Sequence, residues 1–320
     1  MKPSILASGF TALGALAAAA GAFAQNYPDR PVRFLVAFPP GSSTDIVARI
    51  VAPKITEILG QNVIVENRGG AGGVIGAQAA KRANPDGYTI LMNSSAMVVN
   101  VSLHSNPGYA MSDFIPILQG PTTPNLISVH PSVKAATLKE LIALAKTTQM
   151  SYASSGTGTT PHLGMELLTR TLAKVEMTHV PYGPATAVAA VVGNQVPIAS
   201  TSMPPAVPHV HAARVRPIAV TTAQRSRILP NVPTVAESGF PGFQEHTWFS
   251  FFALAGTPAP VVKRLHAELS RVLQMPDVKE RLDTMSLEFT PNTPAQFAAL
   301  VKAELAKYAR IVKESGAKAD

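Results

Sequence analysis

The chain has 320 residues, of which 46% are hydrophobic and 14% charged, so it is long enough for about two domains and too apolar for a disordered protein. It contains no cysteine, which excludes disulfides, thiolate metal sites and thiol nucleophiles. Lys and Arg outnumber Asp and Glu by 27 to 19, giving a net charge of +8, but the cations are scattered. We therefore expect no nucleic-acid partner.

The first segment has the features of a secretion signal. Lys2 precedes an alanine-rich apolar run from Ile5 to Phe23, which ends in the small-x-small sequence Ala22-Phe23-Ala24. A membrane anchor would need about 20 strongly apolar residues, and this run is mostly alanine. We expect residues 1–24 to be a signal peptide cleaved after Ala24, and the mature protein to lie outside the cytoplasm.

The next hundred residues predict a parallel α/β unit. Residues 32–38 are almost continuously apolar, as in a strand covered on both faces. After the loop 39–43, apolar residues at helical spacing predict a helix with Thr44 or Asp45 as its cap. Two further strands are predicted at 62–66 and 88–93. The strand–helix–strand order is typical of a βαβ fold.

A second unit follows a proline-rich stretch between Pro107 and Pro124, which predicts a break in the chain. Beyond it, short apolar runs predict strands at 126–130, 151–154, 176–180 and 218–221. Helical periodicity predicts helices at 138–146, at about 161–172 and again between Val262 and Tyr308. The fold class is therefore α/β, in two lobes.

Two loops have the composition of anion-binding sites. Residues 41–44 and 154–160 each leave a predicted strand, enter a predicted helix and are rich in Gly, Ser and Thr. Free N–H groups and the partial positive charge at a helix N-terminus favour an anion there. Neither loop carries a lysine placed as in a P-loop, so a carboxylate suits them better than a triphosphate. We expect one carboxylate to lie between the lobes.

Two enzymatic alternatives remain open. A secreted hydrolase would use Ser155 as nucleophile and His162 as base, although no third orienting acid is evident. A nucleotide-binding enzyme would use the glycine-rich segment 70–76, although its Gly-x-Gly-x-x-x-Gly spacing differs from the dinucleotide fingerprint. The simpler interpretation of that segment is that its glycines let a helix pack closely on the sheet. We expect no metal and no cofactor.

The chain also resembles a known family, the Bug-type extracytoplasmic solute receptors of tripartite tricarboxylate transporters. The resemblance covers nearly all of the mature chain. It is carried by these motifs: YPDRPVR at 27–33, FPPGSSTD at 38–45, VENR at 65–68, GAGG at 70–73, PDGY at 85–88, YASSGTGT at 152–159, VPY at 180–182, LPNVPTVAESG at 229–239 and GTPAP at 256–260.

The resemblance implies a type II periplasmic-binding-protein fold, with mixed sheets flanked by helices and a ligand cleft between two lobes. Lobe one would be discontinuous, with residues 25–124 and 248–320, and lobe two would hold 125–247. Two crossing strands near 125–129 and 248–253 would join them. The resemblance also implies a periplasmic location, no enzymatic activity, a monomeric state, and a membrane permease as partner.

The ligand-binding residues that the resemblance implies lie in the two loops and beside them. Carried onto this sequence, they are Gly41, Ser42, Ser43, Thr44, Asp45, Ser94, Ser155, Gly156, Thr157, Gly158, Thr159, His162 and Tyr182. We expect Asp45 to cap its helix, because an unpaired acid would repel an anionic ligand.

This chain departs from the family pattern at three places. Ser42 replaces a second glycine, Gly183 follows Tyr182 without the usual basic residue, and an aspartate is missing near Ser200. Without that aspartate, we expect the far end of the ligand to be uncharged or anionic. The predicted function is a periplasmic receptor that captures a small carboxylate for a transporter. A sensory protein feeding a two-component system is a further alternative.

Overall fold

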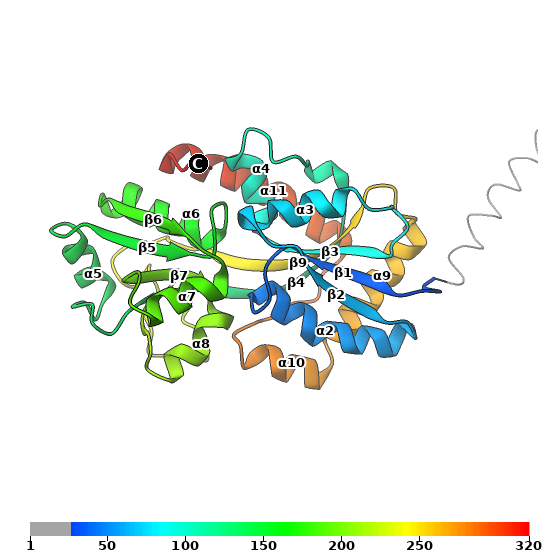
Figure 1. Cartoon of the computed structure of the whole chain (residues 1–320), viewed down its shortest axis with the longest axis horizontal. Coiled ribbons are helices and arrows are strands. Elements are labelled where there is room, and N and C mark those ends of the chain that lie inside the picture. Colours follow the sequence, from blue (N-terminus) through cyan, green and yellow to red (C-terminus); the bar gives the residue numbers. More distant parts are fainter. Residues whose placement is uncertain (1–26, 320) are drawn as a thin grey trace, which may run out of the picture.

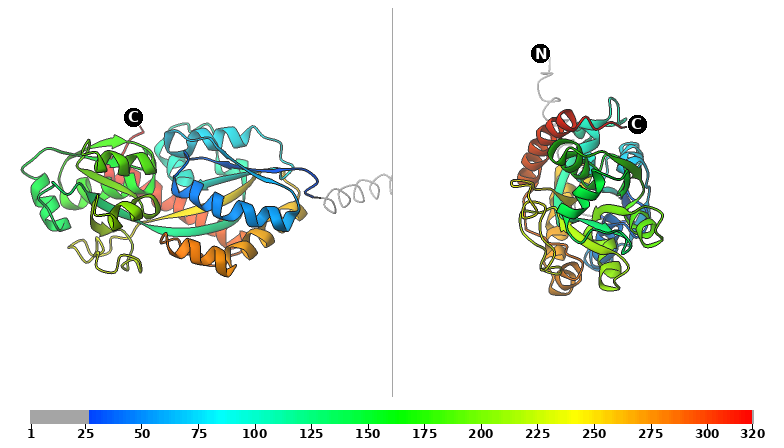
Figure 2. Two further views of the ribbon diagram at one scale, coloured as in Figure 1. Left: turned by 60° about the horizontal axis from the view of Figure 1, so that its bottom comes forward. Right: turned by 90° about the vertical axis from the view of Figure 1, so that its left-hand side faces the viewer.

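The computed structural model describes residues 27–319, so the predicted signal peptide and its cleavage site lie outside the described residues. Two lobes lie side by side along the long axis of the molecule (Figures 1 and 2). One sheet path runs through both, in the order β2-β1-β3-β9-β4-β7-β5-β6, with β8 paired to β4. Over residues 27–319, no helix combines the length and the apolar character needed to span a membrane. The predicted α/β class and two-lobed fold are confirmed.

Lobe one begins with three parallel strands, β1 (Val32–Val36), β2 (Val63–Asn67) and β3 (Thr89–Ser94). Each lies within two residues of its predicted position. The helices that connect or follow these strands are α2 (Ser43–Leu59), α3 (Val74–Lys81) and α4 (Ala96–Leu103), with the 3-10 turn η1 (Ala71–Gly73) before α3. All six residues of β3 are buried, because helices cover both faces of the sheet.

The proline-rich stretch is not a break in the structure. It forms β4 (Phe114–Val129), a long strand that follows the turn η2 (Met111–Asp113) and pairs antiparallel with β9 (His246–Leu254). The prediction was wrong because prolines are tolerated in a strand where the ladder is interrupted. The register shifts at two places, between Pro116 and Leu118 and between Gln119 and Thr122. β4 and β9 run through both lobes and connect them (Figure 1).

Lobe two alternates strands and helices around β5. The strands β6 and β7 both pair with β5 in parallel, and β7 and β8 pair with β4. Its elements are α5 (Leu138–Ala145), β5 (Met150–Ser154), α6 (Thr160–Glu166), the π-helix η3 (Leu167–Ala173), β6 (Met177–Pro181), α7 (Pro184–Val192), β7 (Ile198–Ser202), α8 (Met203–His211) and β8 (Arg216–Val220).

The C-terminal part returns to lobe one. Helix α9 (Ala259–Leu273) buries Leu265, Leu269 and Val272 in the core beneath α2, and α10 (Pro276–Asp283) packs beside it. Helix α11 (Pro294–Ser315) packs on α4 and also reaches α6 and η3 of lobe two. Each lobe has an apolar core of its own, and β4 and β9 connect the two.

Candidate functional site

The two predicted loops, 41–44 and 154–160, both line one cavity at the contact between the lobes, and the start of α2 also bonds to β7. Ser43, at the start of α2 in lobe one, and Ser202, at the end of β7 in lobe two, share a hydrogen bond of 2.7 Å between their hydroxyl oxygens. Both side chains are buried. The lobes therefore contact each other at the position where we predicted the ligand from the sequence.

A small cavity lies at this junction. Its volume is about 20 Å³, roughly the room that one water molecule needs. The residues that line it are Phe38, Ser43, Thr44, Ser94, Ser155, Thr159, Thr160, Pro161, Pro184, Ser202, Thr247 and Phe249. A carboxylate can enter only when the lobes separate.

A second cavity of about 370 Å³ adjoins the first, and the two share Phe38 and Ser155. It is lined by those residues and by Pro39, Pro40, Asn67, the glycine-rich segment 69–73, Tyr182, Gly183 and Thr186. No residue that lines either cavity is charged. We call the two cavities together the interlobe cleft.

In lobe one, the chain enters α2 earlier than predicted. Gly41 has φ +77°, and Ser42 is the N-cap, whose Oγ accepts a hydrogen bond from the Asp45 N–H at 3.2 Å. The predicted cap at Thr44 or Asp45 was therefore wrong, because the left-handed Gly41 turns the chain into the helix sooner and Ser42 takes the cap position. The N-terminal turn of α2 presents Ser43 and Thr44 to the cleft.

Asp45 points back into its own loop. Its carboxylate accepts hydrogen bonds from the Gly41 N–H, from Asn67 and from Arg49, each at 2.9 Å. Burial alone would raise the pKa of Asp45, but these hydrogen bonds outweigh burial and hold the pKa below its ordinary value. The charged Asp45 thus fixes the loop and does not line the cleft cavities.

In lobe two, internal hydrogen bonds shape the loop between β5 and α6. The Gly156 N–H donates to Ser154 Oγ at 3.1 Å, and Thr159 Oγ1 donates to the Gly156 carbonyl at 2.7 Å. Gly156 and Gly158 both have positive φ, so the loop turns sharply into α6. Thr159 is the N-cap residue of α6. Within the described residues, the buried Ser155 Oγ has no hydrogen-bond partner, and Ser155 lines both cavities.

His162 lies behind this loop. Its Nδ1 accepts from the Gly158 N–H at 3.4 Å, and its ring stacks on His179, with centroids 4.1 Å apart. Burial, together with smaller contributions from His179 and Arg170, lowers the pKa of His162 to about 3. No hydrogen bond joins Ser155 to His162 among residues 27–319. The hydrolase alternative needs that hydrogen bond and a base with a pKa near the working pH, so this geometry does not favour it.

The glycine-rich segment of lobe one approaches the lobe-two loop at backbone distance. A Cβ on Gly72 would lie 2.0 Å from the Thr157 carbonyl oxygen. Asn100 of α4 donates to the carbonyls of Gly72, at 3.1 Å, and Gly158, at 3.3 Å. Gly76 allows α3 to approach β1, since its Cβ would lie 2.5 Å from Ala37 Cα. The predicted packing role of this segment is confirmed at Gly76.

The structure thus brings together only part of the predicted set. Ser43, Thr44, Ser94, Ser155 and Thr159 line the smaller cavity, and Tyr182 lines the larger one. Gly41, Ser42, Asp45, Gly156, Thr157, Gly158 and His162 shape or support the loops without lining a cavity. Sequence analysis missed the lining residues Phe38, Thr160, Ser202, Thr247 and Phe249.

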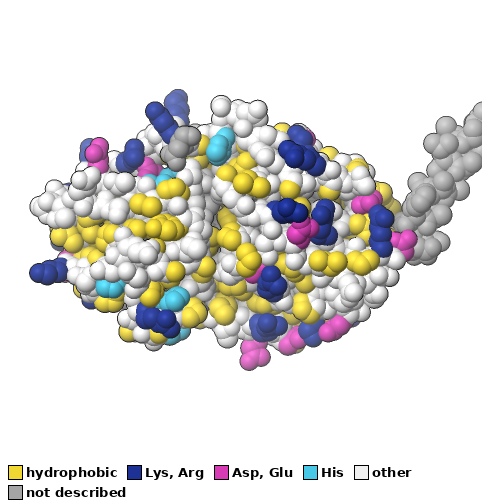
Figure 3. Space-filling view, viewed as in Figure 1, with side chains coloured by type: hydrophobic (Ala, Val, Ile, Leu, Met, Phe, Trp, Pro, Cys, Tyr) yellow, Lys and Arg dark blue, Asp and Glu magenta, His cyan; other side chains and the backbone are white. Residues whose placement is uncertain are grey.

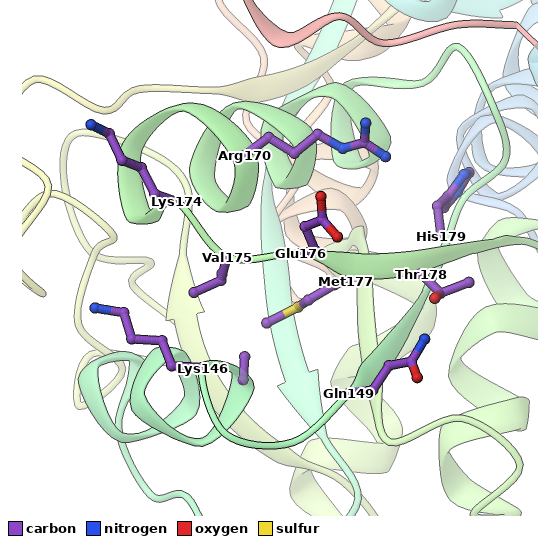
Figure 4. A pocket seen from close by; sticks show the side chains of 10 residues that line it. Lys146, Gln149, Arg170, Lys174, Val175, Glu176, Met177, Thr178 and His179 are labelled. Atoms are coloured by element: carbon purple, nitrogen blue, oxygen red, sulfur yellow. The ribbon is translucent and has the colours of Figure 1, made fainter.

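A cavity larger than both of these lies elsewhere, in a groove on lobe two of about 730 Å³ (Figure 4). We call it the basic groove. It lies between the end of α5 and η3, and its lining residues are Ala145, Lys146, Gln149, Arg170 and residues 174–179. Its cations are exposed to solvent, in contrast to the buried hydroxyls of the cleft.

Comparison with known proteins shows which family shares this arrangement. A family model described as "Tripartite tricarboxylate transporter family receptor" matches residues 47–317. The chain belongs to this family. Protein BugT of Bordetella pertussis is 35% identical over 307 residues, which is 94% of each protein. The predicted resemblance to Bug-type receptors is confirmed.

Solved structures of relatives share the fold of this receptor. The periplasmic binding protein BugD is 34% identical, covers 91% of this chain and 99% of its own, and superposes with a TM-score of 0.87. Rpa4515 of R. palustris with adipate is 32% identical, covers 91% of this chain and 98% of its own, and has the same TM-score of 0.87. The architecture of this receptor is therefore that of a periplasmic solute-binding protein.

Proposed function

We propose that this receptor is a periplasmic monomer that closes its lobes on a small carboxylate and presents it to the membrane permease of a tripartite tricarboxylate transporter. The observation that carries the proposal is the pair of helix starts, α2 and α6, that meet at the smaller, buried and uncharged cavity of the cleft. N–H groups at a helix start and nearby hydroxyls stabilise an anion without a countercharge.

The roles of the side chains follow from their positions. Ser43 and Thr44 face the carboxylate from α2, and Ser155 and Thr159 face it from the lobe-two loop. Ser155 Oγ is free to donate to it, while Thr159 Oγ1 already donates within the loop and acts by holding the loop's shape. Ser94, at the end of β3, and Thr247, near the start of β9, line the same cavity.

Closure needs only contacts that favour the closed state. The hydrogen bonds from Ser43 to Ser202 and from Asn100 to Gly158 exist only when the lobes meet. A carboxylate that contacts both helix starts stabilises the closed state further. The far end of the ligand then extends into the larger cavity. Because that cavity has no charged lining, the proposal includes a ligand whose far end is not an ammonium group.

A thermal-shift screen of the mature protein tests the proposal, with dicarboxylates such as adipate, aromatic carboxylates and amino acids. A ligand that binds only the folded state at about 100 times its dissociation constant adds roughly 2.7 kcal/mol of stability. We expect one carboxylate class to raise the melting temperature, and the corresponding amides to leave it unchanged. Equal stabilisation by acid and amide would contradict the carboxylate site. No stabilisation after denaturing and refolding, which removes any bound ligand, would contradict the receptor function.

A further inference from the structure

The basic groove carries charge that the cleft function does not use. Lys146 extends from the end of α5 and Lys174 from the end of η3, and both reach toward the same open side of the groove (Figure 4). Arg170 lies on the wall above Glu176 (Figure 4). Glu176 is the only acidic residue among those lining the groove.

Internal ion pairs leave most of this charge available. Arg170 Nε lies 2.6 Å from Glu166, a buried acid that also accepts from the Tyr152 hydroxyl, yet half of the Arg170 side chain stays exposed. Among the described residues, neither Lys146 nor Lys174 forms an ion pair. The groove therefore offers an excess of positive charge.

The backbone around the groove has an unusual form. The wall is the π-helix η3, a conformation that is rare and is found frequently at functional sites. Lys174 ends it with φ +52°, a left-handed conformation that costs a non-glycine residue about 1 kcal/mol or more. This geometry directs Lys174 to the same side as Lys146 (Figure 4).

The groove suits an extended chain better than a small anion. Each exposed cation contributes little by itself, so an occupant must contact several of them at once. Val175 and Met177, both largely buried, are the apolar side chains among the residues at 174–179 that line the groove. β6, which forms part of the groove, is the last strand of the sheet, so no further strand covers its outer side. A segment with several carboxylates and some apolar side chains fits these features.

We propose that the basic groove is a docking site for an extended acidic segment of a partner protein. Elements that line the groove are also connected to elements that form the cleft. Its wall η3 continues from α6, whose first residue lines the cleft, and His179 stacks on His162 and shares a hydrogen bond of 2.7 Å with Ser154. The docking proposal goes beyond the proposed function and does not depend on the identity of the cleft ligand.

A binding experiment with a fluorescein-labelled octaglutamate peptide tests the proposal, using the mature protein at about 20 mM salt. Each exposed ion pair is worth about a two- to fivefold change in affinity, so we expect the double variant Lys146→Gln/Lys174→Gln to bind the peptide about four- to twenty-five-fold more weakly. The control Lys263→Gln/Lys302→Gln removes the same charge from exposed helix positions of lobe one and should change the affinity less than about twofold.

Three results would overturn the proposal. Equal weakening in both double variants would show attraction to net charge alone. Full displacement of the peptide by inorganic phosphate at matched ionic strength would identify a small-anion site. Groove-dependent binding to phosphatidylglycerol vesicles, without binding to octaglutamate, would identify a lipid surface as the occupant. Circular dichroism melting of each variant shows that it is folded, so an unfolded variant cannot imitate the expected loss.

Discussion

The interlobe cleft and the basic groove offer an anion opposite kinds of environment. The smaller cavity of the cleft lies between buried hydroxyls, aromatic rings and the starts of α2 and α6, and no residue that lines either cleft cavity is charged. The groove is open and its lining holds three cations and one acid. On the face shown in Figure 3, Lys and Arg side chains lie at scattered, exposed positions.

The difference matters because solvent screens exposed charges and not buried dipoles. An exposed ion pair is worth about 0–1 kcal/mol and weakens with salt. A hydrogen bond to a charged group in a site closed to water is worth about 1.5–3 kcal/mol. The cleft should therefore hold one small carboxylate tightly at any salt concentration, while the groove should bind a multivalent partner weakly and only at low salt.

The largest effect is expected from blocking closure. A Cβ on Gly72 would meet the Thr157 carbonyl oxygen at 2.0 Å, so Gly72→Val should hold the lobes apart. Overpacking costs about 1–3 kcal/mol, which predicts roughly thirtyfold weaker carboxylate binding by calorimetry. Gly60→Val is the matched control, because Gly60 has a similar φ of +66° and no atom within 4 Å of its Cβ. Equal losses in the two variants would show backbone strain and not blocked closure.

A pH effect on stability should arise behind the cleft loop. The pKa of His162 is about 3, below its ordinary value of 6.5, so the folded state binds the proton more weakly than the unfolded state. The stabilisation of the folded state by neutral His162 is therefore complete above pH 6.5, and it is lost as the pH falls toward 3. Between pH 7.5 and pH 4.5 the loss is about 2–3 kcal/mol.

Urea denaturation at both pH values measures this contribution. His162→Asn keeps an acceptor for the Gly158 N–H and should reduce the difference between the two pH values. His211→Gln, at an exposed histidine, should preserve the difference. An unchanged difference in His162→Asn would show that the buried histidine is not responsible.

A smaller effect is expected from single hydroxyls of the lobe-two loop. Ser155→Ala removes a hydroxyl without a partner among the described residues, so it should weaken carboxylate binding about tenfold and leave the melting temperature unchanged. Thr159→Ala also breaks the hydrogen bond to Gly156, so it should lower both the affinity and the melting temperature. Thr159→Ser, which keeps the hydroxyl, should restore both. Unchanged affinity in both alanine variants would place the ligand elsewhere.

The smallest effect on the cleft is expected from the groove. Lys146→Gln/Lys174→Gln should change the affinity for the carboxylate less than about twofold, since both side chains are exposed and line the groove alone. Calorimetry at low and high salt measures this directly. A large loss at low salt that disappears at high salt would mean that the groove, and not the cleft, captures the anion.

Much of the fold could be predicted from the sequence because its signals are local. Apolar runs and helical periodicity placed β1, β5, α5 and α9 within a few residues. Only the end of β4 was predicted, as the strand at 126–130, because prolines normally interrupt strands and only the pairing with β9 shows that the register shifts there. β7 was missed because its sequence, Ile198 to Ser202, is mostly small and polar. Those polar residues are buried only because neighbouring strands surround them.

Site residues within one loop could be predicted from the local sequence pattern. Site residues that come together from distant segments could not. Ser43, Thr44, Ser155 and Thr159 lie next to glycines at helix starts, a pattern visible in the sequence. Ser202 and Thr247 come from a strand end and from the strand β9, and tertiary contacts alone bring them to the cleft. The π-helix beside the basic groove likewise has no local sequence signal that we could identify.

The most direct measurement is a crystal structure of the mature protein with the carboxylate that stabilises it most. The account predicts the carboxylate between the starts of α2 and α6, with one oxygen within hydrogen-bond distance of Ser155 Oγ and no Lys or Arg in contact. A carboxylate paired with Lys146, Arg170 or Lys174 in the basic groove, with the cleft closed and unchanged, would contradict it.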